Sequence, residues 1–187
     1  FKQKTAYEIM PSLVGSEMCI RDRDEAAHVY EHSIEVQLPF LQYIAKKQKK
    51  KFKIIPIVVS TLDFEKCIKF AKVISKKANE CCIIASSDMT HYGSYYGFTP
   101  FLPQEAKEKL KMLDKKIIEE ILNLNIERFY DKAKKTTICG IAPIIIVMQF
   151  AKLKKLKGYL LKYYTSADII HDYRNAVGYA SIVFSEN

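Results

Sequence analysis

The sequence contains no hydrophobic run long enough to form a membrane-spanning helix. Its longest apolar stretch, residues 141–151, is interrupted by Pro143 and Gln149, whereas a span needs about 18 to 20 apolar residues. The hydrophobic fraction of 49% and the charged fraction of 27% are typical of a water-soluble globular protein. The 187 residues suffice for one domain with its own core. We therefore expect a single domain that does not bind membranes.

Cysteine is scarce, and its arrangement excludes a disulfide framework. The chain has five cysteines, an odd number, and no Cys-x-x-Cys pair. Cys81 and Cys82 lie inside an apolar run, where we expect them to act as small buried hydrophobic residues. These features favour a reducing, cytoplasmic setting.

Acidic residues are in the minority, but the basic excess is dispersed. There are 30 Lys and Arg residues against 21 Asp and Glu residues, a formal net charge of +9, which can indicate an acidic partner such as nucleic acid. The basic residues are mostly lysines in short clusters at 46–51, 76–77, 115–116, 134–135 and 152–157. With no arginine-rich stripe and no recognised nucleic-acid module, we expect solvated lysine-rich faces rather than a nucleic-acid interface.

Residues 8–23 show neither the two-residue period of a strand nor the period of a helix. They resemble a peptide that arises when a sequencing adapter is translated in frame. We therefore expect residues 1–23 to be non-native or disordered, and residues 24–187 to be the carboxyl-terminal part of one domain.

Helices and apolar runs alternate over the first half of the remaining chain. Apolar spacing predicts a helix near 33–44, kinked at Pro39, and an amphipathic helix over 63–77. The β-branched run 52–60 and the apolar run 81–85 predict strands buried on both faces. Strand, helix and strand joined by short links predict a right-handed βαβ unit and hence parallel strands.

Three helices and two strands are predicted for the rest of the chain. The helices are expected at 103–122, 126–134 and 144–153, and the strands at 158–166 and 177–184. The two last strands could pair as an antiparallel hairpin. The predicted fold is therefore α/β, with a mixed, largely parallel central sheet flanked by helices.

A cluster of small polar and ionisable residues follows the predicted strand at 81–85. Its members are Ser86, Ser87, Asp88, Thr90 and His91. The carboxyl end of a buried strand is where an α/β protein builds its site, which makes Asp88 and His91 candidate site residues. The alternative is a polar turn in which Asp88 caps the next element and His91 is merely exposed.

Two further positions carry candidate ligands. One is the start of the first predicted helix, which carries Glu31, His32 and Glu35. These residues could form a ligand or acid–base set. Alternatively, the two glutamates are ordinary first-turn acids beside a half-exposed histidine. Cys139 and Gly140 precede a proline-started helix. A helix amino terminus favours a thiolate, which can act as nucleophile or metal ligand, although a buried small residue at a tight turn has the same pattern.

Four motifs, taken in order, resemble those of one known family. They are Glu-His-Ser-Ile-Glu-Val-Gln-Leu-Pro-Phe at 31–40, Ser-Ser-Asp-Met-Thr-His-Tyr-Gly at 86–93, Cys-Gly-Ile-Ala-Pro at 139–143 and Val-Gly-Tyr-Ala-Ser at 177–181. From residue 24 to its end the chain resembles the Memo family, known in prokaryotes as AmmeMemoRadiSam system protein B. The resemblance implies a fold like that of class III extradiol dioxygenases, here incomplete at its amino terminus.

The resemblance also implies a redox metal, iron or copper, bound by two histidines and one cysteine. By motif match His32 is the second histidine ligand and Cys139 the cysteine ligand, while Asp88 and His91 are polar residues of the pocket. The first histidine of the family lies upstream in an Ala-Pro-His-Ala-Gly-Tyr-like segment that this sequence lacks. We therefore expect metal binding of an intact protein rather than of this chain alone.

Two classes of function remain open at this point. One is a redox or oxygen-handling metalloprotein, which could be a metal-dependent oxidoreductase with Asp88 or His91 moving a proton. The other is a noncatalytic module that binds a peptide or a small molecule. The family's system name also implies an accessory partner of a radical-SAM enzyme. Extradiol relatives use a carboxylate where this family uses cysteine, so the fold does not carry their activity with it.

Overall fold

The structure is a computed structural model that describes residues 28, 29, 31–59, 63–78 and 81–186. The chain divides into two compact units, residues 1–59 and 60–187. The expectation for residues 1–23 falls outside the described residues and stays a prediction. In the described part of the chain, no helix is both long and apolar enough to cross a bilayer.

The described part of the first unit contains a 3₁₀ turn that continues into an α-helix. The turn η2 spans Glu35–Gln37 and the helix α3 spans Leu38–Lys47. Pro39 lies in the first turn of α3, where its missing N–H removes no helical hydrogen bond. The predicted helix is confirmed, but Pro39 marks where the α-helix begins rather than a kink inside it.

The strand predicted at 52–60 is wrong for its described part, residues 52–59, which have no strand assignment. A β-branched sequence favours an extended backbone, but a strand also needs a neighbour that completes its hydrogen-bond ladder. Pro56 lacks an N–H and weakens such a ladder further. The segment is chain without regular secondary structure after α3.

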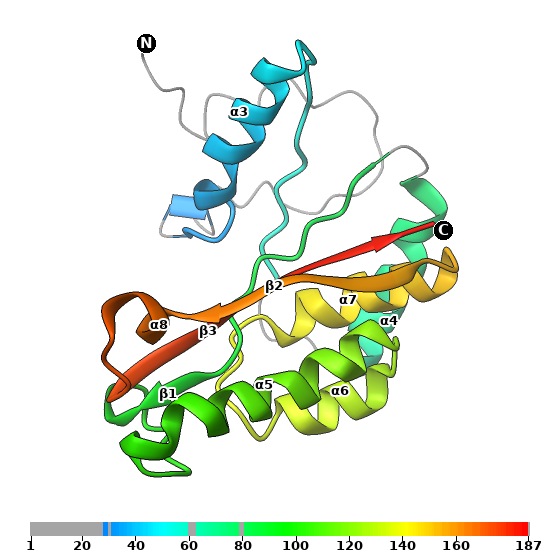
Figure 1. The fold of residues 1–187 in the computed structure, drawn as a ribbon. Helices are drawn as coiled ribbons and strands as arrows, with labels where there is room; N and C mark the ends of the chain where they lie inside the picture. The colour runs from blue at the N-terminus through cyan, green and yellow to red at the C-terminus, as the bar shows by residue number, and fades with distance from the viewer. Residues whose placement is uncertain (1–27, 30, 60–62, 79–80, 187) are drawn as a thin grey trace. The chain divides into compact units, whose positions relative to one another are not determined.

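The second unit contains a three-stranded sheet in the order β1-β3-β2. The strands are β1 (His91–Gly93), β2 (Lys157–Thr165) and β3 (Asn175–Ser185), and β2 and β3 cross the unit side by side (Figure 1). The predicted pairing of the last two strands is confirmed. Their antiparallel register runs from Lys157 opposite Ser185 to Thr165 opposite Gly178, with an irregularity between Leu160 and Lys162.

The predicted parallel sheet is wrong for the described residues, because both strand pairs are antiparallel. Residues 81–85, predicted to be a parallel strand, carry no strand assignment, and Cys81 and Cys82 are exposed rather than buried. An apolar run specifies an extended chain but not the direction or identity of its neighbour. Here the chain first bonds to the sheet at Met89 and Thr90, directly before β1, which runs opposite to β3.

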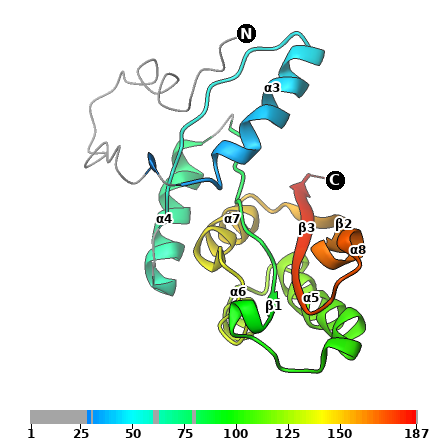
Figure 2. The same ribbon diagram turned by 90° about the vertical axis from the view of Figure 1, so that its left-hand side faces the viewer.

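The helices of the second unit lie together on one side of the β2–β3 pair (Figure 1). They are α4 (Phe64–Lys77), α5 (Ala106–Leu122), α6 (Ile126–Ala133) and α7 (Ile141–Leu153), with the short α8 (Ser166–Ile170) linking β2 to β3. α5 packs against both β2 and β3, α6 packs against α5 and α7, and α4 packs along α7 (Figure 2). The short turns η3 (Ser94–Tyr96) and η4 (Pro103–Glu105) connect β1 to α5.

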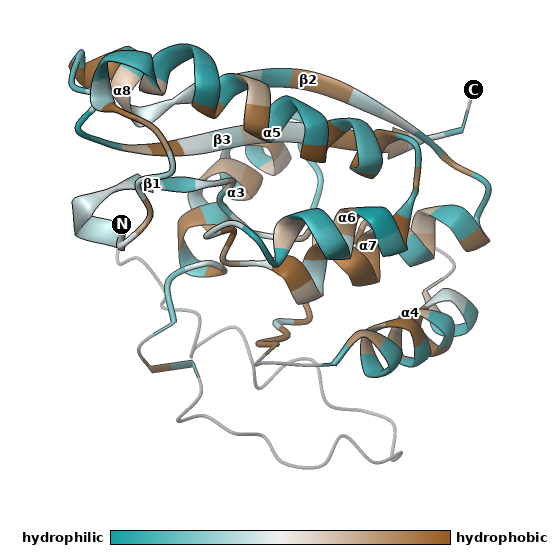
Figure 3. Ribbon diagram, turned by 90° about the horizontal axis from the view of Figure 1, so that it is seen from below, coloured by the Kyte–Doolittle hydropathy of each residue, from teal (hydrophilic) through white to brown (hydrophobic). Residues whose placement is uncertain are grey.

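Local sequence explains where these helices begin and which face they bury. Asp63 caps α4 by accepting a hydrogen bond from the Lys66 backbone N–H at 2.7 Å, and Thr165 and Asp168 form a reciprocal capping box at α8. The helix α7 is hydrophobic along most of its length (Figure 3). A helix of this kind is stable only when neighbours cover it, and α4 and α6 do so.

The core of the second unit contains side chains from β1, α5, α6, α7 and β3. Tyr92, Leu110 and Phe129 are completely buried, and the Tyr92 ring stacks on Phe101 with ring centroids 4.7 Å apart. The Tyr92 hydroxyl donates to the Phe101 carbonyl at 2.9 Å, so its one polar group is satisfied. β1 is thus fixed to the core by the residue that directly follows His91.

Replacing Phe129 with alanine tests this core. Phe129 is 0% exposed, so Phe129→Ala should lower the free energy of unfolding by about 3 to 5 kcal/mol through lost burial and a residual cavity. Urea denaturation followed by circular dichroism measures the change. Met112→Ala is the control, because Met112 lies on the neighbouring helix α5 and is 56% exposed. This substitution should change the free energy of unfolding by no more than about 0.5 kcal/mol.

Candidate functional site

Asp88 and His91 lie on the stretch of chain that enters β1. Between them Met89 and Thr90 are buried, at 3% and 0% exposure. Their backbone is bonded to β3, since the Met89 N–H donates to the Gly178 carbonyl at 2.9 Å and the Gly178 N–H donates to the Thr90 carbonyl at 3.0 Å. The two candidate residues therefore flank a segment that is tied to the central strand.

Cys139 lies on the loop that leads into α7, directly before the helix cap Gly140. The Gly140 N–H donates to the Ser87 hydroxyl at 2.9 Å, and a Cβ on Gly140 would come within 2.4 Å of the Ser87 Cβ. Only glycine allows the two loops to approach this closely. The sequence pattern of cysteine and glycine before a helix thus reflects a close contact between chain segments.

Further hydrogen bonds join the Cys139 loop to the Asp88–His91 segment. The Asp88 N–H donates to the Cys139 sulfur at 3.3 Å. The His91 N–H donates to the Thr137 hydroxyl at 2.8 Å, and this hydroxyl in turn donates to the His91 carbonyl. Thr137 therefore satisfies both backbone groups of His91 and fixes the distance between the two loops.

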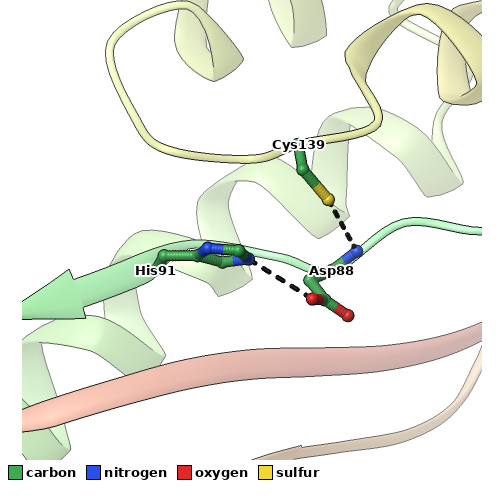
Figure 4. Close-up of side chains that lie close together, drawn as sticks. All are labelled: Asp88, His91 and Cys139. Carbon is green, nitrogen blue, oxygen red and sulfur yellow. Dashed lines mark hydrogen bonds and ion pairs between the residues drawn. The ribbon is translucent and has the colours of Figure 1, made fainter. Parts of the chain in front are cut away.

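These contacts bring three different metal-binding groups together. One ligand atom each from Asp88, His91 and Cys139 lies within 4.8 Å of the others, and Figure 4 shows the imidazole facing the carboxylate and the thiol turned toward the Asp88 backbone. His91 Nε2 is 3.3 Å from Asp88 Oδ2. Within the described residues this nitrogen is buried and has no hydrogen bond of good geometry, and Tyr96 covers the ring edge-on at 5.0 Å between centroids.

His32 lies in the first unit and is described there alone. Its Nδ1 is 3.2 Å from Glu35 Oε2, and the imidazole is 78% exposed. The neighbouring Glu31 carboxylate accepts hydrogen bonds from the Ser33 N–H and hydroxyl and from the Ile34 N–H. Glu31 thus has a capping role within this unit, and the assignment of His32 as a metal ligand stays a prediction.

A buried carboxylate lies beneath the site. Asp114 of α5 is 0% exposed and accepts hydrogen bonds from the Thr90 N–H at 3.3 Å and from the Tyr163 hydroxyl at 2.8 Å. Burial raises the pKa of Asp114 above its usual range, and the hydrogen bonds from Thr90 and Tyr163 oppose that rise only in part. Burial and the neighbouring Asp114 also raise the pKa of Tyr163.

Sequence reasoning missed Asp114 and Thr137. Asp114 had a detectable signal, because it occupies the same helical stripe as Leu110 and Ile117, where an apolar residue is expected. Thr137 had no such signal, because nothing in the sequence distinguishes a threonine two residues before a cysteine. A surface hollow of about 720 Å³, lined in part by Phe101, Leu102 and Arg174, contains none of the three clustered residues.

The donor set fits a transition metal. Thiolate, imidazole and carboxylate together suit iron or copper better than magnesium or calcium, which prefer oxygen ligands. The buried His91 Nε2 without a hydrogen bond is the kind of atom that such an ion would satisfy. The same three groups could also form an acid–base pair beside a nucleophilic thiol.

Comparison with known proteins finds one family. The sequence profile described as Memo-like protein matches residues 4–183. The MEMO1 family protein of Thermococcus onnurineus is 39% identical over 174 residues, covering 88% of this chain and 60% of that protein. The counterpart in Methanosarcina mazei is 38% identical over 183 residues, covering 94% and 62%. The chain thus spans about 60% of the length of the curated relatives it matches.

Replacing Thr137 with valine tests the link between the two loops. The change removes the hydroxyl that bonds both backbone groups of His91, and an unsatisfied buried donor costs about 1 to 3 kcal/mol. The His91 amide should therefore exchange its hydrogen at least about tenfold faster, the equivalent of about 1.4 kcal/mol.

Hydrogen exchange read by NMR measures this rate, and Thr136→Val is the control. The Thr136 hydroxyl donates to the Ala133 carbonyl at 2.8 Å and does not touch His91. Equal exchange rates at His91 in both variants would show that Thr137 does not hold the segment.

The raised pKa of Asp114 predicts a pH dependence of stability. The folded chain holds the Asp114 proton more tightly than the unfolded chain does, so this group's contribution is most favourable below the unfolded pKa of about 3.8 and is lost as pH rises through the folded pKa. Asp114→Asn cannot titrate. The free energy of unfolding of the wild type minus that of the variant should therefore fall as pH rises above about 4.

Urea denaturation at a series of pH values measures that difference. Asp131→Asn serves as the control for replacing an exposed carboxylate. A wild-type-minus-variant difference that rises with pH would mean that the pKa of Asp114 is lowered by its hydrogen bonds rather than raised by burial.

Proposed function

Since this chain belongs to the Memo-like protein family, we propose that it contributes a redox-metal site, for iron or copper, to an oxygen-handling or redox protein. The observation that carries the proposal is the convergence of Asp88, His91 and Cys139, whose ligand atoms lie within 4.8 Å of one another. The three residues come from two chain segments that are held together by hydrogen bonds between backbone groups and side chains, which gives the donors fixed positions.

Each residue has a distinct role in this proposal. The Cys139 sulfur and the His91 Nε2 would hold the metal, and the Asp88 carboxylate, 3.3 Å from the imidazole, would either complete the ligand set or orient the imidazole. When bound, iron or copper supplies one-electron chemistry and an open position for O₂ or a substrate. The chain itself supplies a carboxylate–imidazole pair that can hold a proton beside that position.

The family resemblance adds His32 as a ligand and an extradiol-dioxygenase-like architecture for the whole protein. Both are part of the proposal, as is a partnership with a radical-SAM enzyme, which co-purification of the two proteins would test. The described cysteines Cys67, Cys81, Cys82 and Cys139 are free thiols, in keeping with a cytoplasmic location.

Metal content tests the proposal directly. The sequence predicts metal binding of an intact protein rather than of this chain alone, but the cluster of Asp88, His91 and Cys139 supplies three donors within the chain itself. The chain, loaded anaerobically with Fe(II) or Cu(I) and desalted, should therefore retain metal by elemental analysis. Cys139→Ala and His91→Ala should each weaken binding by at least about tenfold, because each removes a donor. Asp88→Asn keeps the shape of the side chain, so retained metal in this variant would assign Asp88 to orientation rather than ligation.

Two matched variants control for the loss of a thiol and of an imidazole. Cys82→Ala removes an exposed cysteine, and His171→Asn preserves the left-handed backbone at that residue, where φ is 58°. Neither should change the metal content. His32→Ala tests the family's second histidine. If the wild-type chain retains no metal, the redox proposal is wrong, and the cluster is better explained as part of a peptide- or small-molecule-binding module.

A further inference from the structure

The segment that separates Asp88 from His91 is held from one side by β3 and α5. β3 supplies the carbonyl and the N–H of Gly178, which bond Met89 and Thr90 at 2.9 and 3.0 Å. α5 supplies the Asp114 carboxylate, whose Oδ1 accepts the Thr90 N–H at 3.3 Å. The backbone N–H groups of Met89 and Thr90 therefore both have partners on regular elements of the second unit, Gly178 on β3 and Asp114 on α5.

The Asp114 carboxylate lies against Gly178 of β3, where the strand carries no side chain. A Cβ on Gly178 would lie 2.1 Å from Asp114 Oδ2, so any side chain at residue 178 would displace the carboxylate. The same oxygen accepts the Tyr163 hydroxyl of β2 at 2.8 Å. The two oxygens of the Asp114 carboxylate thus have separate partners. Oδ1 accepts the Thr90 N–H of the site segment. Oδ2 accepts the Tyr163 hydroxyl, which fixes the orientation of the carboxylate.

Stability alone does not explain a carboxylate at this position. Asp114 shares its helical stripe with Leu110 and Ile117, which are 0% and 1% exposed, and an apolar residue there would avoid the cost of burying an ionisable group. Replacing buried polar sets by apolar residues of similar volume is often neutral or stabilising. The carboxylate is therefore suited to a task that packing cannot perform, which is to accept a specific backbone N–H.

We propose that Asp114 is a positioning residue of the Asp88–His91–Cys139 site, acting through the Thr90 N–H with Tyr163 as its orienting partner. The inference rests on the proposed function for the metal as the ligand. The positioning of Asp88 and His91 by Asp114 does not depend on it. Asp114 fixes the backbone midway between Asp88 and His91, and so sets the spacing of the carboxylate and the imidazole. It touches neither the metal nor a substrate.

The test uses the full chain, Co²⁺ as the metal probe, and two readouts. The thiolate-to-cobalt absorption band reports binding at Cys139, and NMR of the metal-free protein reports the amide and imidazole signals of His91. Asp114→Asn should weaken Co²⁺ binding by about tenfold and shift the His91 signals, while the signals of His171 stay in place as an internal reference.

A second variant separates positioning from stability. Asp114→Leu combined with Tyr163→Phe removes both polar groups of the buried pair and keeps an apolar side chain in the helical stripe. It should remain folded by circular dichroism, yet show the same loss of Co²⁺ affinity and the same shift at His91. A purely structural Asp114 would leave both readouts unchanged in this folded variant, and that result would overturn the inference.

The structure contains a matched control pair. Asp168 on α8 also accepts a tyrosine hydroxyl, from Tyr173, and caps its helix through Thr165. Asp168→Asn should leave Co²⁺ affinity and the His91 signals unchanged. If the wild-type chain binds no Co²⁺, the proposed function fails, and the His91 signals in the folded double variant then decide the positioning role: a shift supports it and no shift overturns it.

Discussion

The close approach of three chain segments at Gly178 is the constraint on which the second unit depends. Its backbone bonds Met89 and Thr90, and the space where its Cβ would be is filled by the Asp114 carboxylate. A residue with a side chain there would push the sheet away from α5 or the carboxylate away from Thr90. The placement of Met89 and Thr90, and with it that of Asp88 and His91 on either side of them, depends on this contact.

The site itself is assembled by hydrogen bonds between backbone groups and short side chains. The Asp88 N–H meets the Cys139 sulfur, both backbone groups of His91 meet Thr137, and Gly140 meets Ser87. These bonds engage the Cys139 sulfur but not the Asp88 carboxylate or the His91 imidazole, and they place the three ionisable groups next to one another. Groups that are fixed through the backbone vary less in position than the ends of long side chains do. A metal site requires ligand atoms in such fixed positions.

Local features of the sequence predicted the helices and the candidate residues, and nonlocal pairing limited the rest. The amphipathic stripe over 63–77 was enough to place α4. The polar cluster after residue 85 and the Cys139–Gly140 pair marked the site residues that the structure brings together. The runs at 52–60 and 81–85 were predicted as strands, but their described parts have no strand assignment. Composition does not specify a strand's partner, so the predicted parallel sheet was wrong. Asp114 was missed because an aspartate within a helix is normally taken to be exposed.

The position of β1 in the chain has a consequence for the order of folding. β2 and β3 are close in sequence and can pair early, whereas Gly93 must find Asn175, from which the helices α5, α6, α7 and α8 and the strand β2 separate it in the sequence. Contacts between distant residues carry a larger loop-closure entropy and form late. Asp88 and His91 lie on or beside this last-docking strand, and short peripheral strands are also the first to detach in partial unfolding. The candidate site is therefore expected to be completed last during folding and lost first on heating, before the helical core melts.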